Sequence, residues 1–224
     1  IAGQSSGGTS VFALLSVSKN ITSSLFTGAI SMSGSPNISL SLANAELQNA
    51  SFNSNCNCSR DNNTEILECM RNLSAIDLVQ CVPPSWGLNG VWNLPKSQHG
   101  QNYTGLVIVD GTVISSSFKN SLATGHGNIV PLMMGNMQCE SDEGPELVVT
   151  NYTVNEWQLL LNTTFQPWTK TLSLDSRLND DNYGDIIAHN MDILYSNQSH
   201  VNPQKAFDSI VSDYGLYCAQ IQIT

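Results

Sequence analysis

Gly3-Gln4-Ser5-Ser6-Gly7 is the most informative stretch of this chain. Its pattern, G-x-S-x-G, is typical of a tight turn from a strand into a helix, in which the central serine takes a strained backbone conformation. Glycines are expected on either side because such a turn brings the neighbouring backbone too close for side chains. The apolar residues within 11–15 predict a buried helix directly after the turn. At the start of that helix, the amide of Ser6 would point at a developing negative charge.

A flexible loop of glycine and serine is the alternative interpretation, because a bare G-x-S-x-G also arises by chance. A strand-to-helix turn needs a preceding strand within a sheet, and only Ile1-Ala2 could belong to one. Either the pattern is accidental, or the chain is a piece of something longer.

The composition indicates a globular protein with an acidic balance. The 224 residues hold Lys+Arg 8 against Asp+Glu 18, which gives a formal net charge of -10, and 41% of them are hydrophobic. Nucleic-acid binding needs a basic face, so this balance argues against nucleic-acid partners. No apolar run is long enough to span a bilayer, and no signal peptide is visible. A signal peptide upstream of Ile1 would not be seen here, so its absence carries no weight.

Two features favour the secretory route. The chain has six cysteines, an even number, and four of them are clustered between positions 56 and 81. The chain also has more N-x-S/T glycosylation acceptors than its richness in Asn and Ser explains. These acceptors are Asn20, Asn37, Asn49, Asn57, Asn62, Asn72, Asn102, Asn151, Asn162 and Asn197.

The clustered cysteines are Cys56, Cys58, Cys69 and Cys81. A zinc site is one interpretation, but the spacings lack a paired C-x-x-C and no histidine lies among them. We favour a disulfide loop from Cys56 or Cys58 to Cys69, with Cys81 closing a second bridge. The sequence alone does not fix the pairing. We predict no metal site and no cofactor.

Strands and helices alternate along the rest of the chain, which indicates an α/β architecture with a parallel or mixed sheet. Apolar spacing predicts a helix over 38–53, and Thr64 is expected to cap a short helix that ends at Arg71. Ser74-Ala75-Ile76-Asp77 has the form of a capping box. Asn202-Pro203 is a plausible start for the last helix. The other expected elements are a buried strand over 129–134 and helices over 154–161, 183–195 and 203–223.

Five further stretches occur in the order of one known family. They are Ser24 to Asn37 with its ending Ser33-Gly34-Ser35-Pro36, Glu68-Cys69-Met70-Arg71, Leu106 to Gly111, Met133-Met134-Gly135-Asn136 followed by Glu140, and the segment with Tyr214, Cys218, Ala219 and Gln220. Together with the serine turn, they resemble the type-B carboxylesterase and cholinesterase family over the whole chain. The resemblance implies that residues 1–224 are the central part of one α/β-hydrolase domain, with an incomplete, mostly parallel sheet and flanking helices.

The resemblance also implies catalytic roles. A serine hydroxyl reacts at neutral pH only when a base takes its proton and an acid orients that base. Ser5 would be the nucleophile, and the backbone N–H of Ser6 would belong to the oxyanion hole. Counting from Gly135 places Glu140 in the position of the acid. Glu143 is the alternative, because Asp142-Glu143-Gly144 matches the D-E-G motif that is common in the family, although it lies three residues later. For either glutamate, the non-functional interpretation is a solvated carboxylate in a loop.

The chain offers no histidine in the family's position. In this fold the base follows the acid in the sequence. His99 and His126 precede Glu140, and His189 and His200 follow it too closely. We therefore expect the base beyond Thr224, and we expect this segment to be inactive by itself.

The sequence thus predicts part of a secreted serine esterase that acts on a small-molecule ester through an acyl-enzyme. The alternative is a cholinesterase-like adhesion or binding module, which uses the same fold without catalysis. Retention of Ser5 and Glu140 favours the esterase. The oligomeric state and the acyl preference cannot be read from the sequence.

Overall fold

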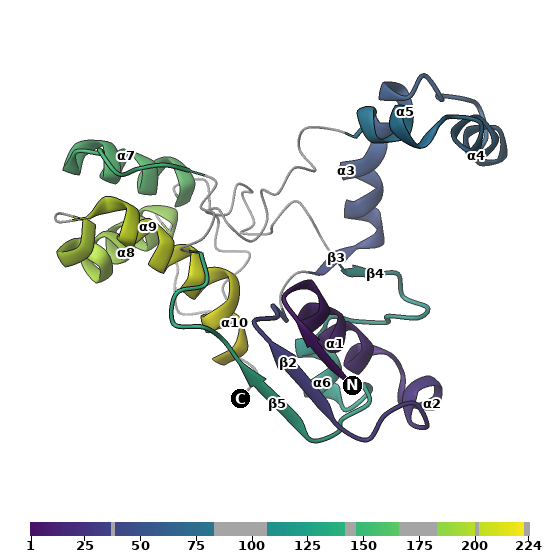
Figure 1. Ribbon diagram of the computed structural model, residues 1–224, viewed down its shortest axis with the longest axis horizontal. Coiled ribbons are helices and arrows are strands. Elements are labelled where there is room, and N and C mark those ends of the chain that lie inside the picture. The colour runs from purple at the N-terminus through teal and green to yellow at the C-terminus, as the bar shows by residue number, and fades with distance from the viewer. Residues whose placement is uncertain (37–38, 83–106, 142–146, 166–182, 200–201, 222–224) are drawn as a thin grey trace.

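The computed structural model describes residues 1–36, 39–82, 107–141, 147–165, 183–199 and 202–221. The described chain falls into three groups of elements (Figure 1). One group is built on a small parallel sheet, the second is a set of disulfide-linked helices, and the third is a helical group near the C-terminal end.

The central sheet contains three parallel strands in the order β1 (Ala2–Gln4), β2 (Ala29–Met32) and β5 (Leu132–Gly135). Gln4 lies opposite Met32, and Met32 lies opposite Gly135, so the three strands end level with one another. The strand expected over 129–134 is therefore present but begins three residues later. Because the strands are parallel, the segments that follow them all leave from one edge of the sheet.

Helices cover one face of this sheet. They are α1 (Ser6–Ser16) and α6 (Phe118–Thr124), and the short α2 (Lys19–Thr22) follows α1. Strand β2 alternates as its period of two requires, with Ala29 and Ser31 buried and Ile30 and Met32 exposed. The core beneath the helices contains Val11, Phe12, Leu15, Phe26, Ala29 and Phe118.

The second group starts from a two-stranded parallel sheet of β3 (Ser39–Ser41) and β4 (Val107–Val109). Helix α3 (Leu42–Asn55) follows β3, so the helix expected over 38–53 begins later, and Leu40 lies in a strand instead. Helices α4 (Asn63–Arg71) and α5 (Ala75–Gln80) complete the group. Asn62 caps α4, so the expectation that Thr64 is the cap was wrong. Ser74 caps α5 by accepting from the Asp77 amide, which is one half of the expected capping box, and its hydroxyl donates to the Asp77 carboxylate.

Two cysteine pairs hold this second group together. Cys58 pairs with Cys69, with 5.6 Å between their Cα atoms, and Cys56 pairs with Cys81, with 5.0 Å between theirs. Of the two partners left open for Cys69, the structure selects Cys58, and Cys81 closes the second bridge. All four sulfur atoms are thereby used, so none of them is a thiolate available to zinc.

The third group contains α7 (Val154–Phe165), α8 (Tyr183–Ser199) and α9 (Pro203–Ser212). Pro203 is in the first turn of α9, and Asn202 caps it, as expected. The helical run then continues as the π-helix η3 (Asp213–Tyr217) and α10 (Cys218–Ile221), so the single helix expected over 203–223 is divided. Its core contains Val149, Trp157, Leu161, Phe165, Ala188, Ala206, Phe207, Ile210 and Val211.

The architecture is α/β, with helices packed on a small parallel sheet. Among the helices that the structure describes, none has the length and apolar character needed to cross a bilayer.

Candidate active site

Ser5 occupies the junction between β1 and α1 in a strained backbone conformation. Its φ is 57° and its ψ is -122°, values that L-residues rarely adopt. Two hydrogen bonds hold it there: the Ser5 amide donates to Met32 O at 2.9 Å, and the Thr9 amide donates to Ser5 O at 3.0 Å. A conformation of this kind costs on the order of 1–3 kcal/mol and is retained only where the surrounding structure enforces it.

The hydroxyl of Ser5 is not used to cap the helix that it precedes. A serine at an N-cap normally takes an extended conformation and accepts a hydrogen bond from the first turn. The N-caps of the other described α-helices for which one is assigned all accept such a bond through their side chains: Ser18, Ser41, Asn62, Ser74, Ser117 and Asn202. Ser5 is exposed, so its hydroxyl is available to a molecule outside the protein.

Close backbone contacts explain the glycines around Ser5 only in part. A Cβ on Gly3 would collide with Gly7 O and lie 2.9 Å from Gly8 N. A Cβ on Gly8 would lie 2.9 Å from both Met32 O and the Cα of Gly34. Gly7, by contrast, has no atom of the described chain within 4 Å of such a Cβ. The expectation of crowding was therefore right for Gly3 and wrong for Gly7, and the unforeseen close contact is at Gly8.

The amide of Ser6 lies at the first position of α1, where backbone N–H groups have no partner within the helix. Among the described residues, none accepts a hydrogen bond from this amide. Ser6 is exposed beside Ser5, so a negatively charged oxygen bound at the hydroxyl of Ser5 could accept this N–H.

Glu140 lies in the loop of residues 136–141, here called the acid loop, which follows β5. Its Oε1 accepts a hydrogen bond of 2.6 Å from the amide of Met137. Its own amide donates to Ser212 Oγ at 3.2 Å. Glu140 is half-buried, and its Oε2 has no hydrogen-bond donor among the described residues. Glu143 lies outside the described residues.

Ser5 and the acid loop leave the same edge of the sheet, with β2 between them. The ladder continues one residue past the strands: Ser5 N donates to Met32 O at 2.9 Å, and Ser33 N donates to Gly135 O at 2.7 Å. Neighbouring strands are about 4.8 Å apart, so the backbones of β1 and β5 are about 10 Å apart at this edge. Within the described residues no hydrogen bond joins Ser5 to Glu140, and a third group would have to connect them. Ligands of parallel sheets characteristically bind outside this edge.

A model of the carboxylesterase family matches residues 1–224, which is the whole chain. The chain belongs to the carboxylesterase family. The resemblance read from the sequence is thereby confirmed at family level. Membership of the carboxylesterase family indicates an ester hydrolase with small-molecule ester substrates.

Neither of the two histidines that the structure describes is hydrogen-bonded to Ser5 or Glu140. His126 is exposed just after α6, and His189 is exposed on α8. His99 and His200 fall outside the described residues. The prediction that the base comes from beyond Thr224 stays a prediction.

The remaining predicted modification sites are mostly on the surface. Asn20, Asn57, Asn62, Asn72, Asn151, Asn162 and Asn197 are exposed. Asn37 and Asn102 lie outside the described residues, as does the side chain of Asn49. Glycosylation at these positions stays a prediction.

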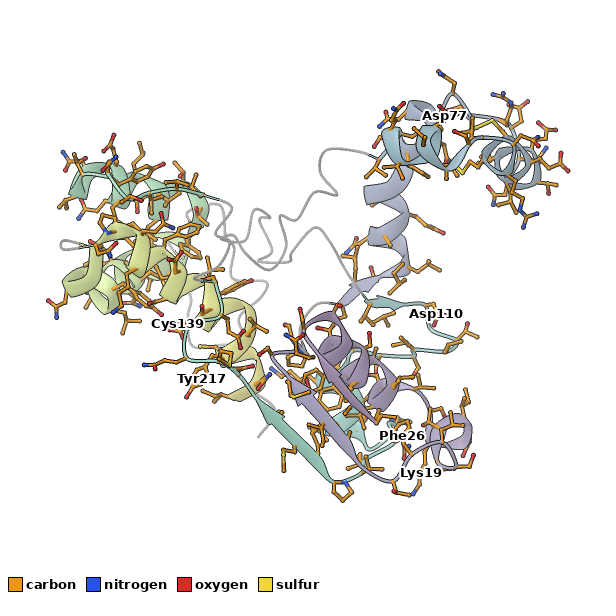
Figure 2. The ribbon with its side chains drawn as sticks, in the orientation of Figure 1. Lys19, Phe26, Asp77, Asp110, Cys139 and Tyr217 are labelled. Atoms are coloured by element: carbon orange, nitrogen blue, oxygen red, sulfur yellow. A yellow bond between two sulfur atoms is a disulfide. The ribbon has the colours of Figure 1, made fainter. Side chains whose placement is uncertain are left out.

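Sequence reasoning did not find the groups that hold the acid loop of this carboxylesterase chain. Ser212, at the end of α9, accepts from the amides of Glu140 and Ser141. Gln220 of α10 had been noted as a family landmark, and it donates to Asn136 Oδ1 at 2.7 Å. These contacts join residues 72 and 84 positions apart, and no local sequence pattern reports them. Figure 2 marks the two segments by Cys139, in the acid loop, and Tyr217, in η3.

Two cysteines outside the disulfides lie in the same region. Cys139 precedes Glu140, and Cys218 begins α10, and both are exposed. Partial burial raises the pKa of the Cys218 thiol, and the nearby Asp213 carboxylate raises it further. A raised pKa keeps this thiol protonated and unreactive at neutral pH.

Proposed function

We propose that this chain carries the nucleophile and the acid of a serine esterase of the α/β-hydrolase fold, and that residues 1–224 are part of one such domain. The observation that supports this most strongly is the backbone of Ser5, which is strained and forgoes the capping bond that a serine at this place would usually make. Backbone strain that no capping bond offsets is characteristic of functional sites.

In the proposed reaction, Ser5 Oγ attacks the carbonyl carbon of the ester while a base removes its proton. The carbonyl oxygen becomes negatively charged, and the free amide of Ser6 at the start of α1 donates a hydrogen bond to it. The alcohol leaves after taking the proton from the base. Water then attacks the acyl-enzyme by the same route in reverse, which releases the acid and restores Ser5.

We assign Glu140 as the acid that orients the base. Its Oε1 is held by the amide of Met137, which fixes the carboxylate relative to the end of β5. Its Oε2 is left to accept an N–H from an imidazole that bridges to Ser5. This arrangement uses β2 as the spacer between the nucleophile and the acid. We further propose a secretory location, for which the disulfides of the second group and the exposed N-x-S/T acceptors are the support.

The test is active-site labelling of the protein expressed from its complete coding sequence. A fluorophosphonate probe should form an adduct that peptide mass spectrometry assigns to Ser5. Ser5→Ala should abolish labelling and the hydrolysis of p-nitrophenyl acetate. Ser6→Ala is the matched control, because it keeps the backbone N–H and should retain most of the activity.

The assignment of the acid is tested by a pair of variants. Glu140→Gln should lower kcat by about 10⁴-fold, the loss seen when the acid of such a triad is made neutral. Glu143→Gln should leave kcat within a few-fold of the wild type. The reverse result would transfer the role to Glu143. A wild-type protein that neither labels nor hydrolyses esters would reject the esterase and favour a binding module.

A further inference from the structure

The acid loop is held by a helical run from the other end of the chain. This run is formed by α9, η3 and α10, and it contacts the loop at both of its ends. The run is itself anchored, since Tyr195 of α8 donates its phenol proton to Asp213 of η3. The side chain of Gln204 binds the backbone of Leu147 and Val149, further along from the acid loop.

At the far end of the loop, Ser212 is the centre of a buried network. Its Oγ accepts from the amide of Glu140 at 3.2 Å and from the amide of Ser141 at 3.3 Å. Ser141 Oγ donates to Asp208 O at 2.6 Å, so the 3.1 Å contact between the two hydroxyls has Ser212 as donor. A serine hydroxyl has one donor and two acceptor positions, and all three of Ser212 are therefore used. Ser212 and Ser141 are 6% and 0% exposed, so these bonds are shielded from bulk water.

At the near end, Gln220 joins the ends of two strands. Its Nε2 donates to Gly34 O, just beyond β2, and to Asn136 Oδ1, just beyond β5, each at 2.7 Å. Gln220 is 5% exposed. Gly34 packs directly on the first turn of α1, which follows Ser5. The side-chain amide of Gln220 therefore links the start of the acid loop to the end of β2, which packs on the helix that follows Ser5.

We propose that Ser212 and Gln220 are positioning residues for the hydrolytic site: they hold the acid loop, and with it the Glu140 carboxylate, at a fixed place relative to Ser5. This inference rests on the proposed esterase function with Glu140 as the acid. Neither residue touches the reacting atoms. Their effect comes through geometry, because a displacement of about 1 Å in a catalytic group can lower the rate by about 100-fold.

The test compares three variants, with Ser212→Thr as a rescue, of the protein expressed from its complete coding sequence. Ser212→Ala removes the acceptor of two buried amides, and Gln220→Glu keeps the size of the side chain but removes both of its donors. Ser121→Ala is the matched control: Ser121 is also fully buried, and its hydroxyl contacts Ser116 Oγ and Ser16 O, away from the acid loop.

We expect Ser212→Ala and Gln220→Glu to lower kcat by about 10-fold to 100-fold with KM nearly unchanged. We expect Ser121→Ala to lower the Tm by a similar amount without lowering kcat. Ser212→Thr keeps the hydroxyl and should recover most of the lost kcat. Equal kcat in all three variants, or an equal loss in Ser121→Ala and Ser212→Ala, would overturn the proposal.

Hydrogen exchange separates this proposal from the proposed function. The amides of Glu140 and Ser141 should be protected in the wild type and should exchange at least tenfold faster in Ser212→Ala. Rapid exchange of both amides in the wild type would reject the anchor, even if the esterase activity is present. The wild type could instead show protected amides without any labelling or ester hydrolysis. That result would support the hydrogen bonds of Ser212 to the acid loop, but it would reject both the proposed esterase function and a positioning role in catalysis.

Discussion

Replacing Gly34 by alanine should separate the end of β2 from α1. The added Cβ would collide with the carbonyl carbon of Gly8 and lie 2.6 Å from Thr9 N and 2.5 Å from Ser31 Oγ. Ordinary contacts begin at 3.4 Å, so the first turn of α1 must move by about 1 Å to clear the carbonyl carbon of Gly8. Two of these three atoms belong to the backbone, and a side-chain rotation cannot relieve them.

The cost of this movement can be worked from the contacts it breaks. Overpacking of a close-packed site costs about 1–3 kcal/mol. The shift also stretches two bonds of 3.1 Å, from Ser31 Oγ to Gly8 O and from Ser35 N to Thr9 Oγ1, each worth about 1 kcal/mol. We expect a loss of about 3–5 kcal/mol in the free energy of unfolding. For a domain of this size that lowers the Tm by about 6–20 °C.

Thermal melting and fluorophosphonate labelling would be measured on the same samples. Labelling at Ser5 should slow in Gly34→Ala even below the Tm, since the first turn of α1 fixes the serine. Gly7→Ala is the matched control, because its Cβ meets no described atom within 4 Å and alanine favours a helix by about 1 kcal/mol. The reasoning is refuted if Gly34→Ala melts within about 2 °C of the wild type, or if the two variants lose stability equally.

Three other changes test separate parts of the structure. Thr153→Ala removes the two hydrogen bonds that its hydroxyl makes at the N-terminus of α7 and should cost about 1 kcal/mol in urea unfolding. Burial raises the pKa of Tyr214 to about 12, so the stability that its neutral phenol contributes is complete below pH 10 and is lost as the pH rises toward 12. Ultraviolet titration of Tyr214→Phe should lack one late-ionising phenol. Ser5→Gly should abolish labelling yet raise the Tm by a few degrees relative to Ser5→Ala, because glycine tolerates a positive φ without strain.

The predictions that the structure supports were those based on short sequence patterns. The serine turn, the start of α9 at Asn202-Pro203 and the cap at Ser74 each depend on residues within a few positions of one another. Asn62 could have been recognised in the same way. It precedes Glu65 by three residues, which is the spacing of a capping box, and the structure shows its side chain accepting from the Glu65 amide at 2.9 Å.

The remaining errors concern contacts between distant segments. Leu40 was expected in a helix because its spacing to the following apolar residues is helical. It lies in β3 because that strand pairs with residues 107–109. No local sequence pattern predicts this pairing. Gln220, in α10 beyond η3, binds Gly34 and Asn136, which are 186 and 84 residues away, and no local pattern predicts these partners either. The crowding at Gly8 comes from Gly34, 26 residues away.

The energetic argument for function at Ser5 depends on what a purely structural serine would do. An extended N-cap would avoid about 1–3 kcal/mol of backbone strain and gain a capping bond worth about 1 kcal/mol. Ser117, at the start of α6 on the same face of the sheet, does this with φ -59° and accepts from Asn120 N. Ser5 instead keeps the strained conformation, enforced from both sides by Met32 O and Thr9 N. The sequence therefore gives up about 2–4 kcal/mol of available stability, and it leaves one hydroxyl exposed with no hydrogen bond to the described residues, as the proposed nucleophilic role of Ser5 requires.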